Sequence, residues 1–229
     1  MSRIRSKSMN RLENNIVDLN TLELEVSMDE FKKYLGINED RRFGYSMKVE
    51  VVKYEDMWQE IKNSAMFTIG KDTGKYPNDA WKKKMLLSEH SPIRDGYFIL
   101  NCYDIPSFVI GHIVRHFNGI EKYVQSLRED RADWDEVPNR NTLQNVRLRI
   151  NYQAFINISR RRLCSCASKE TREFWKLVLD AIGEYEPILK SVCVRECVYR
   201  GFCPEQKKDC KYSEGEAFKK EVEEYRKGL

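Results

Sequence analysis

The sequence predicts an α+β protein in which helices predominate. Two segments have the length and apolar pattern of strands, and several others repeat apolar residues with the period of a helix. The length also supports this fold class, because a chain of 229 residues buries roughly 70% of its unfolded surface. One large core can therefore form without disulfides.

The two expected strands differ in their pattern. Residues 46–54 (SMKVEVVKY) alternate apolar and polar side chains, which is typical of a strand with one face in the core. Residues 97–102 (YFILNC) form a compact apolar run, which favours a buried strand. The polar residues 1–45 precede both strands as an extension, in which Ser27 can cap a short helix over 28–35.

Most of the remaining chain is predicted to be helical. Helical patterns cover residues 55–66, 81–87, 104–117, 150–163, 169–182 and 213–229. Residues 128–149 are charged and contain Pro138, so we expect an irregular segment there. The chain then divides into the extension 1–45, a main domain over 46–190, and a Cys-rich segment with the C-terminal helix over 191–229.

The charge and the apolar runs of the chain argue against several classes of protein. With 40 Lys and Arg against 36 Asp and Glu, the net charge of +4 is too small to argue for a nucleic acid partner. No apolar run approaches the ~18 residues of a membrane span, and the basic N-terminus lacks the apolar stretch of a secretory signal. We therefore expect a cytoplasmic protein without a membrane partner, whose seven Cys are reduced thiols or metal ligands.

The first candidate site lies on the helix predicted at 104–117. His112, Arg115 and His116 are spaced i, i+3 and i+4, so they share one face opposite an apolar stripe. A guanidinium fork beside two imidazoles suits an anionic ligand. The alternative is the exposed polar face of an ordinary amphipathic helix.

Two further groups of polar residues follow along the chain. Ser126 and Arg128 offer donors to a phosphate, although these residues by themselves favour a salt-bridged surface loop. Asn151 and Arg162 are eleven residues apart, about three helical turns, so they share a face of the helix predicted there. A planar heterocycle would pair with both, whereas the alternative is that Arg160–Arg162 complements the helix dipole.

The order and spacing of these groups resemble the flavin-dependent thymidylate synthases. The matching residues are Ser91-Pro92-Ile93-Arg94, a strand, Arg115-His116, Ser126-x-Arg128, and Asn151-x5-Asn157-x4-Arg162. The chain resembles a divergent member, because Phe117 stands where the Arg-His-Arg motif of the family has its second Arg. An Asn-Glu pair is also absent, and the further phosphate-binding Arg is either Arg140 or Arg147.

The resemblance implies a central antiparallel or mixed sheet flanked by helices, in a homotetramer with shared active sites. It implies reductive methylation of deoxyuridine monophosphate (dUMP), with FAD as cofactor, methylenetetrahydrofolate as carbon donor and NADPH as reductant. The implied substrate-binding residues are His112, Ser126, Arg128 and Arg162, and the implied flavin-binding residues are Ser91, Arg115, His116, Asn151 and Asn157. Arg162 is the catalytic candidate, because a guanidinium at the pyrimidine would stabilise negative charge that spreads into the ring.

Two alternatives stay open at this point. The same site could hydroxymethylate the pyrimidine, since the degenerate motif makes a changed outcome conceivable. A protein of another class, a nucleotide- or nucleic-acid-binding zinc protein that has lost the redox step, would explain the weakened flavin motif and the cysteines. A yellow purified protein favours the enzyme, and a colourless metal-containing one favours the rival.

Four cysteines near the C-terminus form a candidate metal site. Cys193, Cys197, Cys203 and Cys210 read C-x3-C-x5-C-x6-C, and four thiolates within 18 residues can bind zinc or an iron–sulfur cluster. We place zinc ahead of the cluster. The alternative is a set of reduced, partly buried thiols, as expected for Cys102, Cys164 and Cys166 in the core.

Overall fold

The computed structural model describes residues 45–128, 130–131, 137–206 and 210–227. The unit described is the one formed by residues 45–229. The extension and the short helix expected over 28–35 lie outside the described residues. No helix in the described ranges is both long enough and apolar enough to cross a membrane.

A four-stranded antiparallel sheet forms the centre of the unit. Its strands are β1 (Lys48–Tyr54), β2 (Tyr97–Pro106), β3 (Ile120–Val124) and β4 (Leu143–Asn151), in the order β1-β2-β4-β3. The strand expected at 46–54 is confirmed, and the one at 97–102 continues for four more residues. The irregular segment expected over 128–149 is wrong in its last third, because β4 begins at Leu143.

The missed strand β4 alternates cleanly between its two faces. Val146, Leu148 and Ile150 are buried, while Arg147 and Arg149 between them are exposed. The arginines give the segment its charged composition, but they occupy only the solvent face, which antiparallel sheets tolerate. The guanidinium of Arg149 lies 4.1 Å from the ring centre of Tyr97 on that face.

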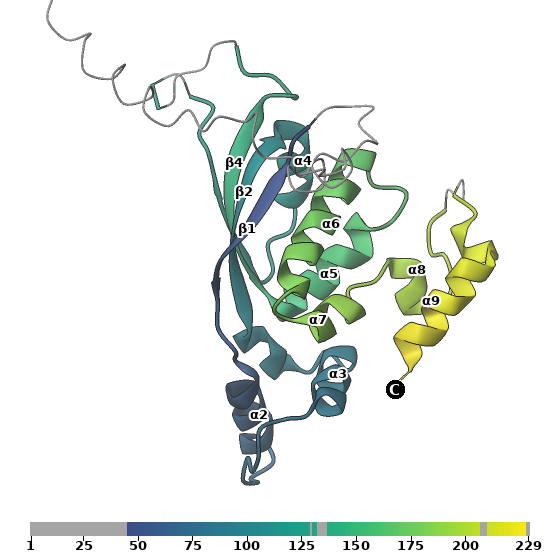
Figure 1. Cartoon of the computed structure of the whole chain (residues 1–229). Helices are drawn as coiled ribbons and strands as arrows, with labels where there is room; N and C mark the ends of the chain where they lie inside the picture. Colours follow the sequence, from purple (N-terminus) through teal and green to yellow (C-terminus); the bar gives the residue numbers. More distant parts are fainter. Residues whose placement is uncertain (1–44, 129, 132–136, 207–209, 228–229) are drawn as a thin grey trace, which may run out of the picture. The chain divides into compact units, whose positions relative to one another are not determined.

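Helices cover the other face of the sheet. Figure 1 shows α4, α5 and α6 on one side of β1, β2 and β4. The α-helices of the described chain are α2 (Trp58–Phe67), α3 (Asp79–Leu87), α4 (Ser107–Ile113), α5 (Tyr152–Arg162), α6 (Lys169–Gly183), α7 (Pro187–Val192), α8 (Glu196–Arg200) and α9 (Glu216–Arg226). Two 3₁₀-helices, η1 (Ser91–Asp95) and η2 (Tyr212–Glu214), lie between them.

The helix expected over 104–117 is much shorter in the structure. Asp104, with a φ of 58°, sits in an irregularity of the β2–β4 pairing, and α4 begins only at Ser107. It ends at Ile113, with the Val114 N–H still bonded to the Ile110 carbonyl. His112 is therefore helical, but Arg115 and His116 follow the helix, so the shared helical face predicted for the three residues is wrong.

A buried carboxylate joins the sheet to the helices. Oε1 of Glu186 accepts hydrogen bonds from the Tyr54 hydroxyl (2.6 Å), the Trp58 indole N–H (2.8 Å) and the Tyr152 hydroxyl (3.0 Å). These donors come from β1, α2 and α5, and Glu186 itself precedes α7. Burial and the neighbouring carboxylate both raise the pKa of Tyr152, so its hydroxyl keeps its proton and donates.

Candidate functional site

Helix α5 carries candidate residues at both of its ends. Asn151 ends β4 and caps α5, because its side-chain oxygen accepts from the Ala154 N–H at 2.9 Å. Arg162 is the last residue of the same helix. Eleven residues of helix separate Asn151 from Arg162 by about 16 Å along the axis. One chain therefore has two neighbouring polar regions, and not a single site that contains both residues.

The first region is a cleft of about 650 Å³ at the start of α5. Its lining residues are Glu89, Arg94, Phe117, Asn118, Gly119, Asn151, Gln153 and Asn157. Its volume lies within the range of small-molecule sites. Two of the expected flavin-binding residues, Asn151 and Asn157, line it.

A glycine lets the backbone approach the cap of α5 at this cleft. Gly119 has a φ of +74°, and its carbonyl accepts from the Asn151 N–H at 2.9 Å. A Cβ at Gly119 would lie 2.5 Å from the side-chain oxygen of Asn151. Any larger residue would therefore combine a strained backbone with the loss of the cap.

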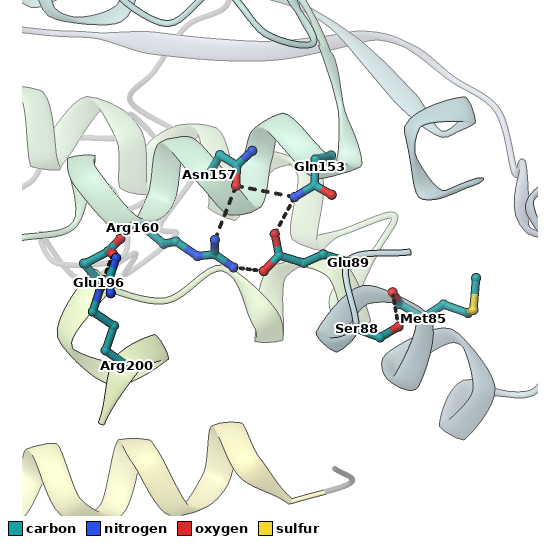
Figure 2. Close-up of polar contacts among 8 residues, drawn as sticks. All are labelled: Met85, Ser88, Glu89, Gln153, Asn157, Arg160, Glu196 and Arg200. Carbon is teal, nitrogen blue, oxygen red and sulfur yellow. Dashed lines mark hydrogen bonds and ion pairs between the residues drawn. The ribbon is translucent and has the colours of Figure 1, made fainter. Parts of the chain in front are cut away.

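Figure 2 shows a polar network of Glu89, Gln153, Asn157 and Arg160, of which the first three line the cleft. Gln153 donates to Glu89 at 2.7 Å, and Arg160 forms an ion pair with the other oxygen of that carboxylate. Asn157 accepts from both Gln153 and Arg160 at 3.4 Å. Glu89 already has two partners, so its negative charge is paired within the network. Among the described lining residues, Arg94 is the cation that can receive an anionic ligand.

The second region centres on Arg162. Its Nε donates to Nε2 of His116 at 2.9 Å, and its Nη2 donates to the carbonyl of His112 at 2.6 Å. Both acceptors are neutral, and among the described residues no carboxylate pairs with this guanidinium. Two of its five donors are therefore used for positioning, and the half-buried positive charge is not compensated by an acid.

The surroundings of Arg162 are strongly basic. Burial, then the charges of Arg115 and Arg161, lower the pKa of Arg162 from its usual value. Burial, then the charge of Arg162, lower the pKa of His116 to about 4, so its ring is neutral at neutral pH and accepts the bond from Arg162. The same two causes lower the pKa of His112, whose Nδ1 lies 2.7 Å from the Thr171 hydroxyl.

One loop connects the two regions. It runs from Val114 after α4 to Gly119 before β3, so His116 contacts Arg162 while Phe117 and Gly119 line the cleft. The side chain of Phe117 is 76% exposed. A ring presented to solvent beside a polar cleft is suited to stacking on a planar ligand.

The remaining expected site residues lie at the surface of the chain. Ser91 is exposed in η1, and Arg115 is exposed in the turn after α4. Ser126 accepts from the Arg128 N–H at 3.2 Å, and the Arg128 guanidinium pairs with Asp130 at 2.7 Å. None of these four residues lines the 650 Å³ cleft.

Several residues that line the cleft had no role predicted from the sequence, among them Arg94, Glu89 and Gln153. Arg94 belongs to the quoted Ser-Pro-Ile-Arg segment, so its position was a usable signal. Glu89 and Gln153 had no signal of their own, because their pairing depends on α5 meeting the end of α3.

The C-terminal cysteines divide between two places. Cys197, Cys203 and Cys210 line a small cavity, together with Cys164 and Cys166 from the loop between α5 and α6. Cys193 does not line that cavity, and burial raises the pKa of its thiol to about 12. In the described ranges, no three His, Cys, Asp or Glu side chains already have the spacing of a bound metal ion.

Comparisons with known proteins identify the fold. No family profile and no curated protein sequence matches the chain. A flavin-dependent thymidylate synthase, ThyX from Helicobacter pylori complexed with FAD and dUMP, superposes with a TM-score of 0.53 at 12% identity, covering 65% of this chain and 100% of that one.

Two other solved structures agree with this match. A second ThyX structure from Helicobacter pylori with FAD and dUMP has a TM-score of 0.50 at 14% identity, and covers 65% of this chain and 99% of that one. The UMP/dUMP methylase PolB from Streptomyces cacaoi, bound with 5-Br dUMP, has a TM-score of 0.52 at 12% identity, covering 68% and 95%. The matched part, about two thirds of this chain, therefore has the fold of the ThyX flavin-dependent thymidylate synthases and of this methylase.

Proposed function

We propose that this protein is a flavin-dependent enzyme that modifies the pyrimidine ring of dUMP, by reductive methylation to thymidylate. Methylenetetrahydrofolate would give the carbon and NADPH would be the reductant. The proposal is supported by two structural neighbours that contain FAD and dUMP, and by a third that is bound with 5-Br dUMP. The observation in this chain that carries it is the half-buried Arg162, held by two neutral acceptors and not paired with an acid in the described residues.

Arg162 is suited to stabilising negative charge on a pyrimidine. Its guanidinium is fixed before any ligand arrives, and its remaining N–H groups can donate to a ring nitrogen and a carbonyl oxygen. Neighbouring positive charges increase the attraction for an anionic ring and nucleotide phosphate. Such preorganised donors lower the energy of charge that develops in a transition state.

The cleft at the start of α5 fits part of a flavin. Asn151 and Asn157 offer amide donors and acceptors to the polar edge of a ring system, and Phe117 offers an aromatic face. Arg94 can receive a phosphate, while the Glu89 carboxylate is already paired. When bound, the flavin would supply the redox chemistry, and these residues would bind and orient it.

The loop carrying Ser126 and Arg128 is suited to the nucleotide phosphate. The present partner of Arg128 is Asp130, and the side chains of the two are 67% and 56% exposed. Exposed ion pairs contribute at most about 1 kcal/mol, so a phosphate can replace Asp130 at little cost. Ser126 is half-buried beside Arg128 and adds a hydroxyl donor.

We propose that the complete site forms between subunits. Arg128 and Arg115 lie outside the cleft of their own chain, and Arg162 stands about 16 Å along α5 from Asn151. A second subunit that brings its loop or its Arg162 to this cleft would assemble all the expected residues. A homotetramer with shared sites is the arrangement we expect, with little activity in a monomer.

The experiment compares two adjacent arginines. In Arg162→Lys, the charge is kept but the fixed fork is lost, so we expect turnover of dUMP to fall at least about a hundredfold while FAD stays bound. The control is Arg161→Lys, because Arg161 is exposed and pairs with Glu205 at 3.7 Å. Equal turnover in the two variants would contradict the role of Arg162.

A second candidate reaction uses the same residues. Hydroxymethylation of dUMP needs the same nucleotide and folate, and Phe117 in place of the second motif Arg favours an altered flavin position. A mass-resolved product assay with dUMP, methylenetetrahydrofolate, FAD and NADPH separates a methyl from a hydroxymethyl product.

A further inference from the structure

Five of the seven cysteines gather around one small cavity. Cys164 and Cys166 come from the loop after α5, Cys197 from α8, and Cys203 and Cys210 from the segment before η2. The cavity has a volume of about 10 Å³. That is roughly the space needed by one water molecule, and far less than a cofactor needs.

The fold brings the two groups of thiols together. All five cysteines line the same cavity. Helix α5, which precedes Cys164 and Cys166, is in contact with α8, which carries Cys197. The five side chains thus form a connected set, although the two groups are more than thirty residues apart in the sequence.

We propose that this cysteine cavity is a structural zinc site, with four of the five thiolates as ligands. Zinc in structural sites takes four ligands in a tetrahedron, and thiolates are preferred. A cavity with room for a single ion fits zinc better than a multi-atom iron–sulfur cluster. In the described residues no three such side chains are placed to hold a metal ion, so the proposal requires the thiols to change rotamer when zinc binds.

The wall of the cavity is suited to the charge of such a site. Four thiolates and one Zn²⁺ carry a net charge of −2. Arg195 lines the cavity, with its guanidinium held 4.0 Å from the ring centre of Tyr212. Arg161 lies nearby, paired with the lining residue Glu205 at 3.7 Å. The lining carboxylates Glu205 and Glu196 are each paired with an arginine, Arg161 and Arg200, and Arg195 would offset part of the negative charge of the site.

The site would fasten the C-terminal part of the unit to helix α5. Three of the cysteines belong to α8 and the segment that leads to η2 and α9. The other two follow directly after α5, within four residues of Arg162. Cys193 is not needed as a ligand, which changes the set expected from the spacing of the last four cysteines.

Zinc content is the first test. Full-length protein, expressed with both zinc and iron in the medium and purified without chelator, is expected to contain one zinc per chain. After chelator treatment, Co²⁺ alone should produce the thiolate-to-metal charge-transfer bands of a tetrahedral site. No bound metal and no such bands would overturn the proposal, as would iron with acid-labile sulfide.

Variants then test the ligand set. The double variant Cys164→Ser/Cys166→Ser and the paired replacement Cys197→Ser/Cys203→Ser each leave only three of the five thiols, so both proteins should lose most of the zinc and melt at a lower temperature. Cys193→Ala is the control and should keep its zinc. Loss of zinc in Cys193→Ala with retention in either double variant would contradict the cavity as the site. The Co²⁺ titration of the unmodified chain decides the matter even if a variant fails to fold.

Discussion

Replacing His116 with glutamine would remove a titratable ring beside Arg162 and keep a neutral acceptor for its Nε–H. In the folded chain the pKa of His116 is lowered to about 4, whereas an unfolded histidine titrates near 6.5. As the pH falls below about 6.5, the unfolded chain therefore binds a proton that the folded chain does not. The free energy of unfolding should decrease with acidification until about pH 4.

The magnitude follows from the two pKa values. A histidine pKa lowered from about 6.5 to about 4 makes about 3 kcal/mol of the free energy of unfolding dependent on pH. Because the ring is partly exposed to solvent, we expect about 2 kcal/mol of this in practice. Urea unfolding of the wild type and of His116→Gln at several values between pH 7 and 4.5 measures it. The difference between the two proteins should change by about 2 kcal/mol over that range. A difference that is the same at every pH would refute the proposed environment of His116.

Three further substitutions test separate parts of the structure. Glu186→Ala leaves three hydrogen-bond donors without their acceptor, so thermal unfolding should show a loss of about 3–5 kcal/mol, or about 10 °C in Tm. Gly119→Ala should lower the free energy of unfolding by about 2 kcal/mol, because it strains the backbone and displaces the Asn151 cap. Gly111→Ala is the control and should not lower it in the same assay, because no atom lies within 4 Å of the new Cβ. Arg128→Ala should raise the Kd for dUMP by about tenfold to a hundredfold in calorimetry, whereas Arg131→Ala, from the same loop, should leave it nearly unchanged.

Local patterns in the sequence predicted most of the elements. Asn151 and Ser168 cap α5 and α6, and the apolar spacing of both helices matches the side chains that the structure buries. Strand β4 also had a local signal, because Val146, Leu148 and Ile150 alternate. Because arginines alternate with these apolar residues, the charged composition of the segment favoured an irregular loop over a strand. The helix at 104–117 was overestimated, because its first residues belong to β2 and its last to a turn.

The candidate site was predictable only in part. Spacing correctly placed Arg162 on the helix that Asn151 caps, but it could not show that Arg162 would be held by His116 and His112. The cysteine cavity depends on the loop after α5 meeting α8, a tertiary contact with no local signature. For the same reason, the spacing of the last four cysteines favoured Cys193 over Cys164 and Cys166.

The proposed action on the pyrimidine ring of dUMP can be tested with the nucleotide itself. The most direct measurement incubates the purified, FAD-loaded protein with dUMP, methylenetetrahydrofolate and NADPH, and follows the nucleotide by mass spectrometry. We predict thymidylate formed in wild type and in Arg161→Lys, with at least about a hundredfold less in Arg162→Lys. Unchanged dUMP in the presence of bound FAD and all co-substrates would contradict the proposed function.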